Sequence, residues 1–181
     1  NKVNKIKEII SRSLNFIFNN FYENNSFHEV VKEAGVQGFT EPDPKIDLSG
    51  VDVARKILIL IRESGYQFDI EDIANRSFLP AECLATTNNE DFFKSLIKNA
   101  AHFENLLEEA KAKDCRLKYV ATFENGKASV GLEFIPKESP FYNLEGKDNI
   151  VQFYTDRYID QPLLIKGAGA GAAVTASGIF A

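Results

Sequence analysis

The spacing of apolar residues changes along this chain, from the period of helices in the first part to the period of strands in the second. Over the first part, apolar side chains recur three or four positions apart, as on the buried face of an amphipathic helix. The predicted helices cover about residues 14–22, begin again at Ser26, run from Ser49 to about Ser64, and span about 89–113. We expect the aromatic stripe of the last helical region to lie in the core.

The later part of the chain predicts a β-sheet. Apolar and polar residues alternate over 117–123 and 128–134, on either side of Asn125-Gly126. An Asn-Gly pair between two such runs is a strong signal for a β-hairpin. Further strands are predicted over 150–154 and 163–165. Because helices and strands do not alternate strictly, we expect an α+β fold, with a mostly antiparallel sheet and helices packed on one face.

Composition indicates a single soluble domain. The chain has 181 residues, of which 44% are hydrophobic, and this is ordinary for a globular protein. The formal net charge of −5 argues against nucleic acid as a partner, since no basic stripe could neutralise phosphates. The longest apolar run, 57–61, is too short to cross a bilayer, and no signal peptide is apparent. We therefore expect a cytoplasmic protein with no membrane partner, and we interpret Lys2, Lys5 and Lys7 as a solvated helix face.

Cysteine and histidine are too sparse to suggest a metal site. Cys83 and Cys115 have neither metal-binding nor redox spacing, and His28 and His102 are widely separated. We expect no metal, and two free, buried thiols in a reducing compartment.

Residues 39–56 concentrate acidic side chains around a proline-rich loop. Glu41 and Asp43 each precede a proline, which favours extended backbone and holds both acids at little entropic cost. Asp52 and Lys56 follow on the next predicted helix, four residues apart and therefore on one face. The stretch is a candidate binding site, although Asp43, between two prolines, is interpreted as structural.

Lys56 has two interpretations. Its helix is apolar nearly all round, which is typical of a buried helix. A buried lysine needs a partner or has a lowered pKa, and a lowered pKa suits proton transfer. Alternatively, Ser49-Gly50-Val51-Asp52 is a capping box and Lys56 is an ordinary ion-pair partner of Asp52. The pattern alone leaves both roles open.

Several ordered motifs run through nearly the whole chain. They are Ser13-Leu14-Asn15-Phe16-Ile17-Phe18, Gly38-Phe39-Thr40-Glu41-Pro42-Asp43-Pro44, Asp47-Leu48-Ser49-Gly50, Asp52-Val53-Ala54-Arg55-Lys56, Leu79-Pro80-Ala81-Glu82, and the run from Pro162 to Gly171. Together they resemble the homoserine dehydrogenase family, and most of all the version found in bifunctional aspartate kinase–homoserine dehydrogenases. The resemblance implies hydride transfer between homoserine or aspartate 4-semialdehyde and NADP or NAD, in threonine and methionine biosynthesis.

The resemblance also implies roles for individual residues. Lys56 matches the catalytic lysine, with Asp52 beside it, and a lysine of lowered pKa can exchange a proton with the reacting oxygen. The implied substrate-binding residues are Glu41, Asp47, Ser13 and Phe39. The implied cofactor contacts are Gly169, Gly171 and Arg12. For Asp47, an ordinary turn or cap role stays open, and carboxylates suit the ammonium group of the substrate.

The glycine-rich tail is not interpreted as a dinucleotide site of its own. Residues 167–172 fit the G-x-G-x-x-A pattern, but only nine residues follow, too few for the rest of a nucleotide-binding unit. The resemblance instead implies that Gly169 and Gly171 lie near the nicotinamide end of a cofactor bound mainly by another domain.

Three positions depart from the family pattern. Arg12 and Glu8 stand where the family usually has glycine, and Phe39 stands where tyrosine is common. Arginine adds bulk and charge where the backbone usually approaches substrate and cofactor. These departures favour a second hypothesis, in which the scaffold is a non-catalytic dimerisation or regulatory module.

The resemblance sets the expected context. It implies a Rossmann domain and a kinase domain that residues 1–181 do not include. We therefore expect a single substrate-binding and dimerisation domain excised from a larger polypeptide, inactive alone and forming a homodimer.

Overall fold

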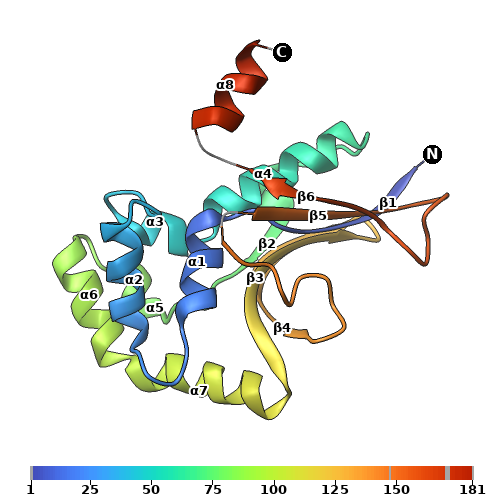
Figure 1. Ribbon diagram of the computed structural model, residues 1–181. Coiled ribbons are helices and arrows are strands. Elements are labelled where there is room, and N and C mark those ends of the chain that lie inside the picture. Colours follow the sequence, from blue (N-terminus) through green and yellow to red (C-terminus); the bar gives the residue numbers. More distant parts are fainter. Residues whose placement is uncertain (1, 147, 170–171, 181) are drawn as a thin grey trace.

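A single mixed sheet organises the structure. The computed structural model describes residues 2–146, 148–169 and 172–180, and its six strands lie in the order β2-β4-β3-β1-β5-β6 (Figure 1). The strands are β1 (Val3–Ile9), β2 (Ile73–Arg76), β3 (Cys115–Glu124), β4 (Lys127–Pro136), β5 (Asp148–Thr155) and β6 (Leu163–Ala168). Every pairing is antiparallel except β2 with β4, so the predicted α+β fold with a mostly antiparallel sheet is confirmed.

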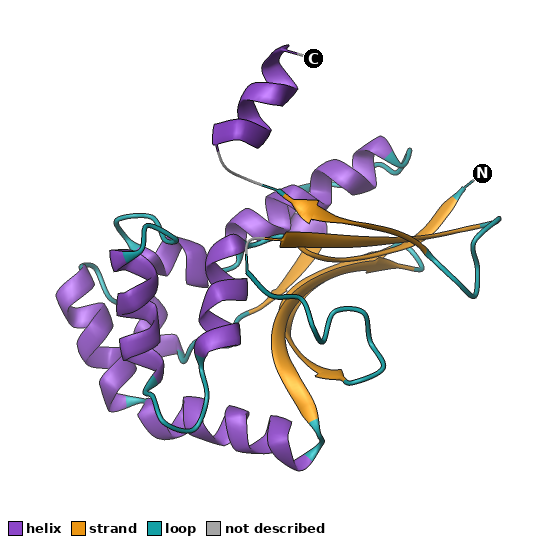
Figure 2. Cartoon of the chain, viewed as in Figure 1, coloured by secondary structure: helices purple, strands orange, loops and turns teal. Residues whose placement is uncertain are grey.

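Most helices gather at one end of the sheet, and α4 lies along it (Figures 1 and 2). The helical elements are α1 (Arg12–Asn20), α2 (Phe27–Val36), α3 (Pro44–Leu48), α4 (Val51–Glu63), α5 (Ala81–Leu84), α6 (Asn89–Lys98), α7 (Ala100–Ala112), α8 (Ala172–Phe180) and a 3₁₀ turn over Ile70–Asp72. In Figure 1, α8 stands apart from the other helices. No helix in the described part of the chain is both long and apolar enough to span a membrane.

The β3–β4 hairpin forms where the sequence predicts it. Asn125 and Gly126 have φ angles of 51° and 69°, so both central turn residues are left-handed, as a type I′ turn requires. Register runs unbroken from Glu124 opposite Lys127 to Cys115 opposite Pro136. Alternate β3 side chains then face the helices, and these include Leu117 and Phe123 of the main core.

The first strand shows that the prediction for the basic start of the chain is wrong. The basic start is not a helix face, because residues 3–9 form β1 between β3 and β5. Lys5 and Lys7 project to one side of β1, where they pair with Glu124 and Glu133. Ile6 and Glu8 project to the other side and are buried. The lysine spacing reflects the two-residue period of a strand rather than a helix.

Two helix predictions also need correction. Residues 89–113 form α6 and α7, which are separated at Asn99. The capping box at Ser49 is wrong, because Gly50 is the N-cap of α4 and has a φ of 75°. A side chain at Gly50 would also collide with the ring of Tyr119. The helix predicted to begin at Ser26 does form, with Ser26 as its N-cap and a capping box with Glu29.

The core has a large part and a small part. The large part lies between the sheet and the helices, and its aromatic centre includes Phe27 stacked on Phe103 with ring centroids 4.1 Å apart. The small part lies on the other face of the sheet, where Phe141 and Leu144 cover Val120. Both cysteines are free, but only Cys83 is buried, so the predicted burial of Cys115 is wrong.

Candidate functional site

The turn between β1 and α1 is the element on which the predicted site residues converge. Ser11 caps α1 by accepting a hydrogen bond from the Leu14 amide at 3.2 Å. Its hydroxyl lies 3.1 Å from that of Ser13. The capped N-terminus of α1 therefore holds Ser13 next to the β1–α1 turn.

Asp47 joins this turn to the proline-rich loop. Its Oδ1 accepts a hydrogen bond from Ser13 Oγ at 2.9 Å, and its Oδ2 accepts one from the Glu41 amide at 2.9 Å. Both carboxylate oxygens are thus engaged, which holds Ser13 and Glu41 in fixed positions. The Glu41 side chain is exposed and open to a ligand.

The proline-rich loop is partly helical rather than extended throughout. Asp43 caps the short helix α3, and its side chain accepts a hydrogen bond from the Lys45 amide at 3.0 Å. This contact confirms the structural interpretation of Asp43. The helix that Asp43 caps also places Asp47 so that its side chain faces the β1–α1 turn.

Lys56 reaches the same turn from α4. Its Nζ lies 2.8 Å from Asp52 Oδ2 and donates to the Ile10 carbonyl at 3.4 Å. The prediction of a buried lysine is wrong, because the Lys56 side chain is 43% exposed. The helix is amphipathic rather than apolar all round, and Ile59, at 58% exposure, faces outward. Lys56 is an ion-paired cation at the edge of the core, open to a ligand.

Arg12 and Phe39 form a stack beside Ser13. The Arg12 guanidinium carbon lies 4.4 Å from the centroid of the Phe39 ring, and Phe39 stacks on Phe16 at 4.4 Å. This cation–π contact fixes the positive charge at the first turn of α1. The Arg12 Nε is buried and has no hydrogen-bond partner in the described structure.

Glu8 is a buried acid near the end of β1, close in the chain to the β1–α1 turn. It is 0% exposed, and neither carboxylate oxygen has a hydrogen-bond partner among the described residues. Burial raises the pKa of Glu8 to about 8, and the positive charge of Lys56 opposes part of that rise. The sequence holds a signal for the burial of Glu8. A strand places Ile6, Glu8 and Ile10 on one side, and both neighbours of Glu8 on that side are apolar.

The glycine-rich tail gives limited support for a cofactor site. Gly167 and Ala168 end β6, and a side chain at Gly169 would collide with the side chain of Asn149. The close contact that favours glycine at position 169 is therefore with the Asn149 side chain. Gly171 lies outside the described residues.

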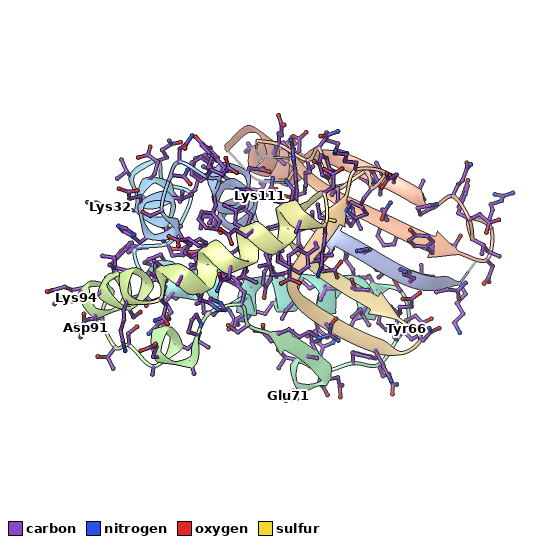
Figure 3. The ribbon with its side chains drawn as sticks, turned by 90° about the horizontal axis from the view of Figure 1, so that it is seen from below. Lys32, Tyr66, Glu71, Asp91, Lys94 and Lys111 are labelled. Carbon is purple, nitrogen blue, oxygen red and sulfur yellow. The ribbon has the colours of Figure 1, made fainter. Side chains whose placement is uncertain are left out.

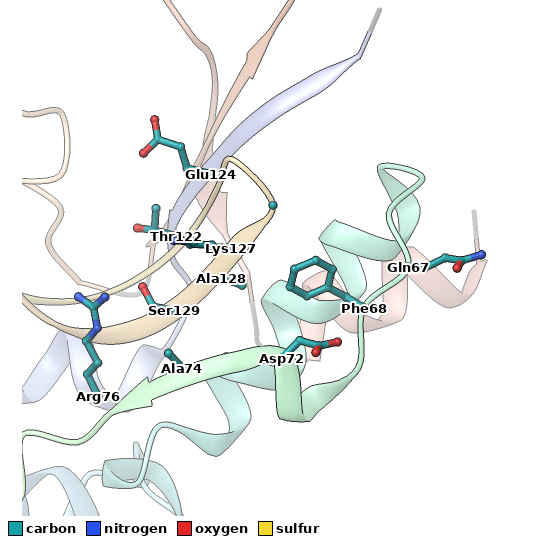
Figure 4. Close-up of a pocket in the computed structure, with 11 residues that line it drawn as sticks. Gln67, Phe68, Asp72, Ala74, Arg76, Thr122, Glu124, Lys127, Ala128 and Ser129 are labelled. Atoms are coloured by element: carbon teal, nitrogen blue, oxygen red, sulfur yellow. The ribbon is translucent and has the colours of Figure 1, made fainter.

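A separate hollow lies at the edge of the sheet where β2 joins β4. Its volume is about 570 Å³, and its lining mixes Asp72 and Glu124 with Arg76 and Lys127 (Figure 4). The hollow is lined in part by residues that follow the C-terminal end of α4. Lys56 is in the first half of that helix and does not line the hollow. No predicted site residue lines it.

Charged and aromatic side chains also lie at the two ends of the molecule. Lys32, Asp91 and Lys94 lie at the helical end of the molecule, and Tyr66 lies at the sheet end (Figure 3). Lys94 forms an ordinary pair with Glu90 at 2.6 Å, four residues apart on α6. Among the described residues, no group of three histidine, cysteine or acidic side chains could hold a metal ion.

The chain matches known proteins over its full length. The model of a family described as homoserine dehydrogenase matches residues 1–181. The chain is 45% identical over 181 residues to the chloroplastic bifunctional aspartokinase/homoserine dehydrogenase 1 of Arabidopsis thaliana, covering 99% of this chain and 20% of that protein. It is 39% identical over 184 residues to the homoserine dehydrogenase of Schizosaccharomyces pombe, covering 97% of this chain and 49% of that protein.

The fold matches solved structures as well. A crystal structure of S. aureus homoserine dehydrogenase superposes with a TM-score of 0.75 at 26% identity, covering 99% of this chain and 41% of that one. The chain therefore spans about a fifth of the length of the Arabidopsis relative and about half that of the S. pombe relative.

Proposed function

The chain belongs to the homoserine dehydrogenase family, and on that premise we propose that it supplies the substrate-binding and proton-transfer groups for interconverting homoserine and aspartate 4-semialdehyde. The observation that carries this proposal is the convergence at the β1–α1 turn. Lys56 approaches the turn from α4, and Asp47 approaches it from α3. The two interactions bring a cation and several acids to one short segment.

The acids suit the charged end of an amino-acid substrate. Homoserine carries an ammonium group, and charge-assisted hydrogen bonds to carboxylates are strong. Glu41 is exposed, and its backbone is fixed by Asp47. We assign Glu41 and Asp52 to the polar groups of the substrate, with Asp47 and Ser13 holding the loop in place.

Lys56 is assigned to the reacting oxygen. When bound, the nicotinamide cofactor exchanges a hydride with the substrate carbon. In the oxidation of homoserine, the Lys56 amine takes the hydroxyl proton, and in the reverse direction its ammonium returns that proton to the aldehyde oxygen. Asp52, 2.8 Å from Nζ, orients the amine. The choice between NAD and NADP depends on residues that contact the ribose.

The sheet is assigned to self-association. The face of the sheet opposite most helices carries paired charges such as Lys5 with Glu124, and a two-fold axis would place the same surface on both subunits. We propose that this substrate-binding domain also forms a homodimer, as part of a protein that includes a cofactor-binding Rossmann domain and a kinase domain.

The first experiment uses the full-length gene product that carries this chain. Homoserine-dependent reduction of NAD and of NADP is measured for the unmodified protein, Lys56→Ala and Lys94→Ala. Lys94 is a matched control, because it also pairs with an acid four residues away on a helix. We expect Lys56→Ala to lose at least about 100-fold in kcat, as is typical of a lost general acid–base. Lys94→Ala should keep full activity.

Arg12→Gly separates the two hypotheses for this scaffold. Turnover in the unmodified protein would show that Arg12 is compatible with catalysis. Turnover only after Arg12→Gly would indicate an intact scaffold blocked by that side chain. An absence of turnover in every folded variant would refute the dehydrogenase and favour a dimerisation or regulatory module.

A further inference from the structure

Arg12 is a cation that is held in place although no acid pairs with it. Its guanidinium carbon lies 4.4 Å from the centroid of the Phe39 ring, and Phe39 in turn stacks on Phe16, one turn further along α1. Arg12 is half-buried and has no ion pair in the part of the chain that the structure describes, and its buried Nε has no hydrogen-bond partner there. Burying an unpaired charge is costly. The stack explains what holds the guanidinium, but not what its charge meets.

The contact with Phe39 leaves the donors of the guanidinium free. A cation–π contact uses the charge of the group and consumes none of its N–H donors. Phe39 therefore restrains the planar fork of Arg12 without satisfying its hydrogen bonds. A restrained fork matches the two oxygens of a carboxylate, and such bidentate pairs are among the strong hydrogen bonds. The chemistry of this group thus indicates a carboxylate ligand.

Acids of the neighbouring elements already have partners. Asp47 accepts a hydrogen bond from Ser13 at 2.9 Å, and Asp52 pairs with Lys56 at 2.8 Å. The chain carries a net charge of −5, so it has acids to spare, yet none within its described residues pairs with Arg12. The arrangement therefore favours an anion that comes with a ligand.

Arg12 belongs to the same turn as the proposed reaction centre. Lys56 donates to the carbonyl of Ile10 at 3.4 Å, and Ile10 precedes Arg12 by two residues. Consecutive Cα atoms are about 3.8 Å apart, so the Cα atoms of Ile10 and Arg12 are separated by no more than about 7.6 Å. The reacting oxygen and the α-carboxylate of homoserine lie at opposite ends of a short carbon chain. Two cations on one turn suit these two ends.

We propose that Arg12 binds the α-carboxylate of the amino-acid substrate and so selects for substrates that carry this group. The inference rests on the proposed function, which assigns Lys56 to the reacting oxygen and acids to the ammonium group. The α-carboxylate is the remaining charged group of homoserine, and those acids would repel it without a cation nearby. The resemblance implies a cofactor contact for Arg12, but its described contact is with Phe39, one of the implied substrate-binding residues.

The Arg12–Phe39 contact joins two of the positions at which this chain departs from the family pattern. Glycine is usual at position 12 and tyrosine is common at position 39, whereas here the two replacing side chains touch. A glycine has no side chain with which to bind a carboxylate. Arginine in its place therefore adds a recognition group that is particular to this chain.

The test measures homoserine binding to the full-length gene product by isothermal titration calorimetry. NADH or NADPH is present, because a reduced cofactor cannot accept a hydride from homoserine. Homoserinamide, in which an uncharged amide replaces the carboxylate, is titrated in parallel at about pH 6, where α-amino groups remain protonated. The variants are Arg12→Met and the matched control Arg76→Met, since Arg76 is an exposed arginine that lines the separate hollow. Circular dichroism confirms that each variant is folded.

We expect Arg12→Met to bind homoserine about 10- to 100-fold more weakly than the unmodified protein, as for a lost charged hydrogen-bond partner, and to bind homoserinamide with little change. Arg76→Met should bind both as the unmodified protein does. An unchanged homoserine affinity in folded Arg12→Met, or an equal loss for both ligands, would overturn the inference. A loss confined to the affinity for NADH or NADPH would overturn it too, and would assign the charge to a cofactor phosphate. If Arg12→Met fails to fold, Arg12→Gln, which is also uncharged, gives the same comparison.

The outcome is separable from that of the proposed function. If Lys56→Ala abolishes turnover while Arg12→Met keeps the preference for homoserine over homoserinamide, only the role of Arg12 is wrong. If homoserine binding depends on Arg12 but no folded variant turns over, the dehydrogenase is wrong and the role of Arg12 stands. Turnover that appears only in Arg12→Gly would overturn the inference, since the side chain would then obstruct the substrate. If the folded, unmodified protein binds no homoserine, both proposals are wrong.

Discussion

Glu8 and Lys118 are both completely buried, and they project from the adjacent strands β1 and β3, yet their surroundings differ. Lys118 Nζ donates to Asn15 Oδ1 at 3.2 Å, to the Leu144 carbonyl at 2.6 Å and to Asn19 Oδ1. Burial lowers the pKa of Lys118 to about 8. Glu8 has no such partners, and burial raises its pKa to about 8.

The difference separates a buried charge with a full set of hydrogen-bond partners from a buried acid with none. A lysine has three donor positions, and Lys118 fills all of them with neutral oxygens. It ties α1 and the 137–146 loop to the sheet, so the fold accounts for it. Glu8 ties nothing together, and its only described interaction is the charge of Lys56. The described contacts of Glu8 therefore give it no part in holding the fold together.

The largest expected effect is the loss of stability when Lys118 is replaced. Lys118→Met should lower the free energy of unfolding by about 3 to 5 kcal/mol, because it leaves several buried oxygens without a donor. Urea unfolding followed by circular dichroism measures this loss. A loss below about 1 kcal/mol would show that the Lys118 network is not structural.

The sequence predicts the local features well because they depend on neighbouring residues. The hairpin at Asn125-Gly126 and the helix start at Ser26 need only local interactions, and both form as predicted. The i, i+4 pair of Asp52 and Lys56 is also local, and the ions lie 2.8 Å apart. The resemblance added the site residues, and the structure brings Ser13, Asp47 and Lys56 to one turn.

The missed features depend on residues that are distant in the sequence. The strand β1 carries charges on alternate positions and becomes a strand through β3 and β5 on either side. The short parallel strand β2 likewise depends on β4. Lys118 lies between two core residues of β3, so alternation predicts that it faces outward. Its burial follows from α1 and the loop that ends in Gly146.

The second prediction concerns the pH dependence of Glu8. The folded pKa of Glu8 is raised from 4.5 to about 8, so between these values the folded protein keeps a proton that the unfolded chain has lost. Stability contributed by this group therefore falls as pH rises through that window. Relative to the unmodified protein, Glu8→Gln should be about 4 kcal/mol more favourable at pH 9 than at pH 5.

Urea unfolding at the two pH values gives this difference directly. Comparing one variant at two pH values removes the fixed cost of burying an unpaired amide. Thr122→Val is the control, because Thr122 Oγ1 is also buried without a described partner but does not titrate, so its effect on unfolding should be the same at both pH values. A Glu8→Gln effect that does not change with pH would mean that Glu8 is ionised at a normal pH, and the contrast with Lys118 would disappear.

The third prediction removes one acceptor from Lys118 and leaves the others. Asn19 Oδ1 accepts from Lys118, and Asn19 Nδ2 donates to the Leu144 carbonyl at 3.1 Å. Asn19→Ala should cost about 1 to 2 kcal/mol, less than Lys118→Met, because Asn15 and Leu144 still accept from the amine. The double variant Asn19→Ala, Lys118→Met should then cost less than the sum of the two single losses. Additive losses would show that the two side chains act independently.

The smallest effect is expected for charges that face water. Lys94 and Glu90 lie 2.6 Å apart, closer than Lys56 and Asp52, but their side chains are 66% and 78% exposed. Water solvates both ions when the pair is broken, so Lys94→Ala should change the unfolding free energy by no more than about 0.5 kcal/mol. The same urea titration at low and at high salt checks this value. A loss as large as that of Asn19→Ala would mean that short distance alone determines the strength of an ion pair here. A negligible loss would show that burial and the number of partners decide what a charge contributes, which is the basis for assigning a structural role to Lys118 and none to Lys94.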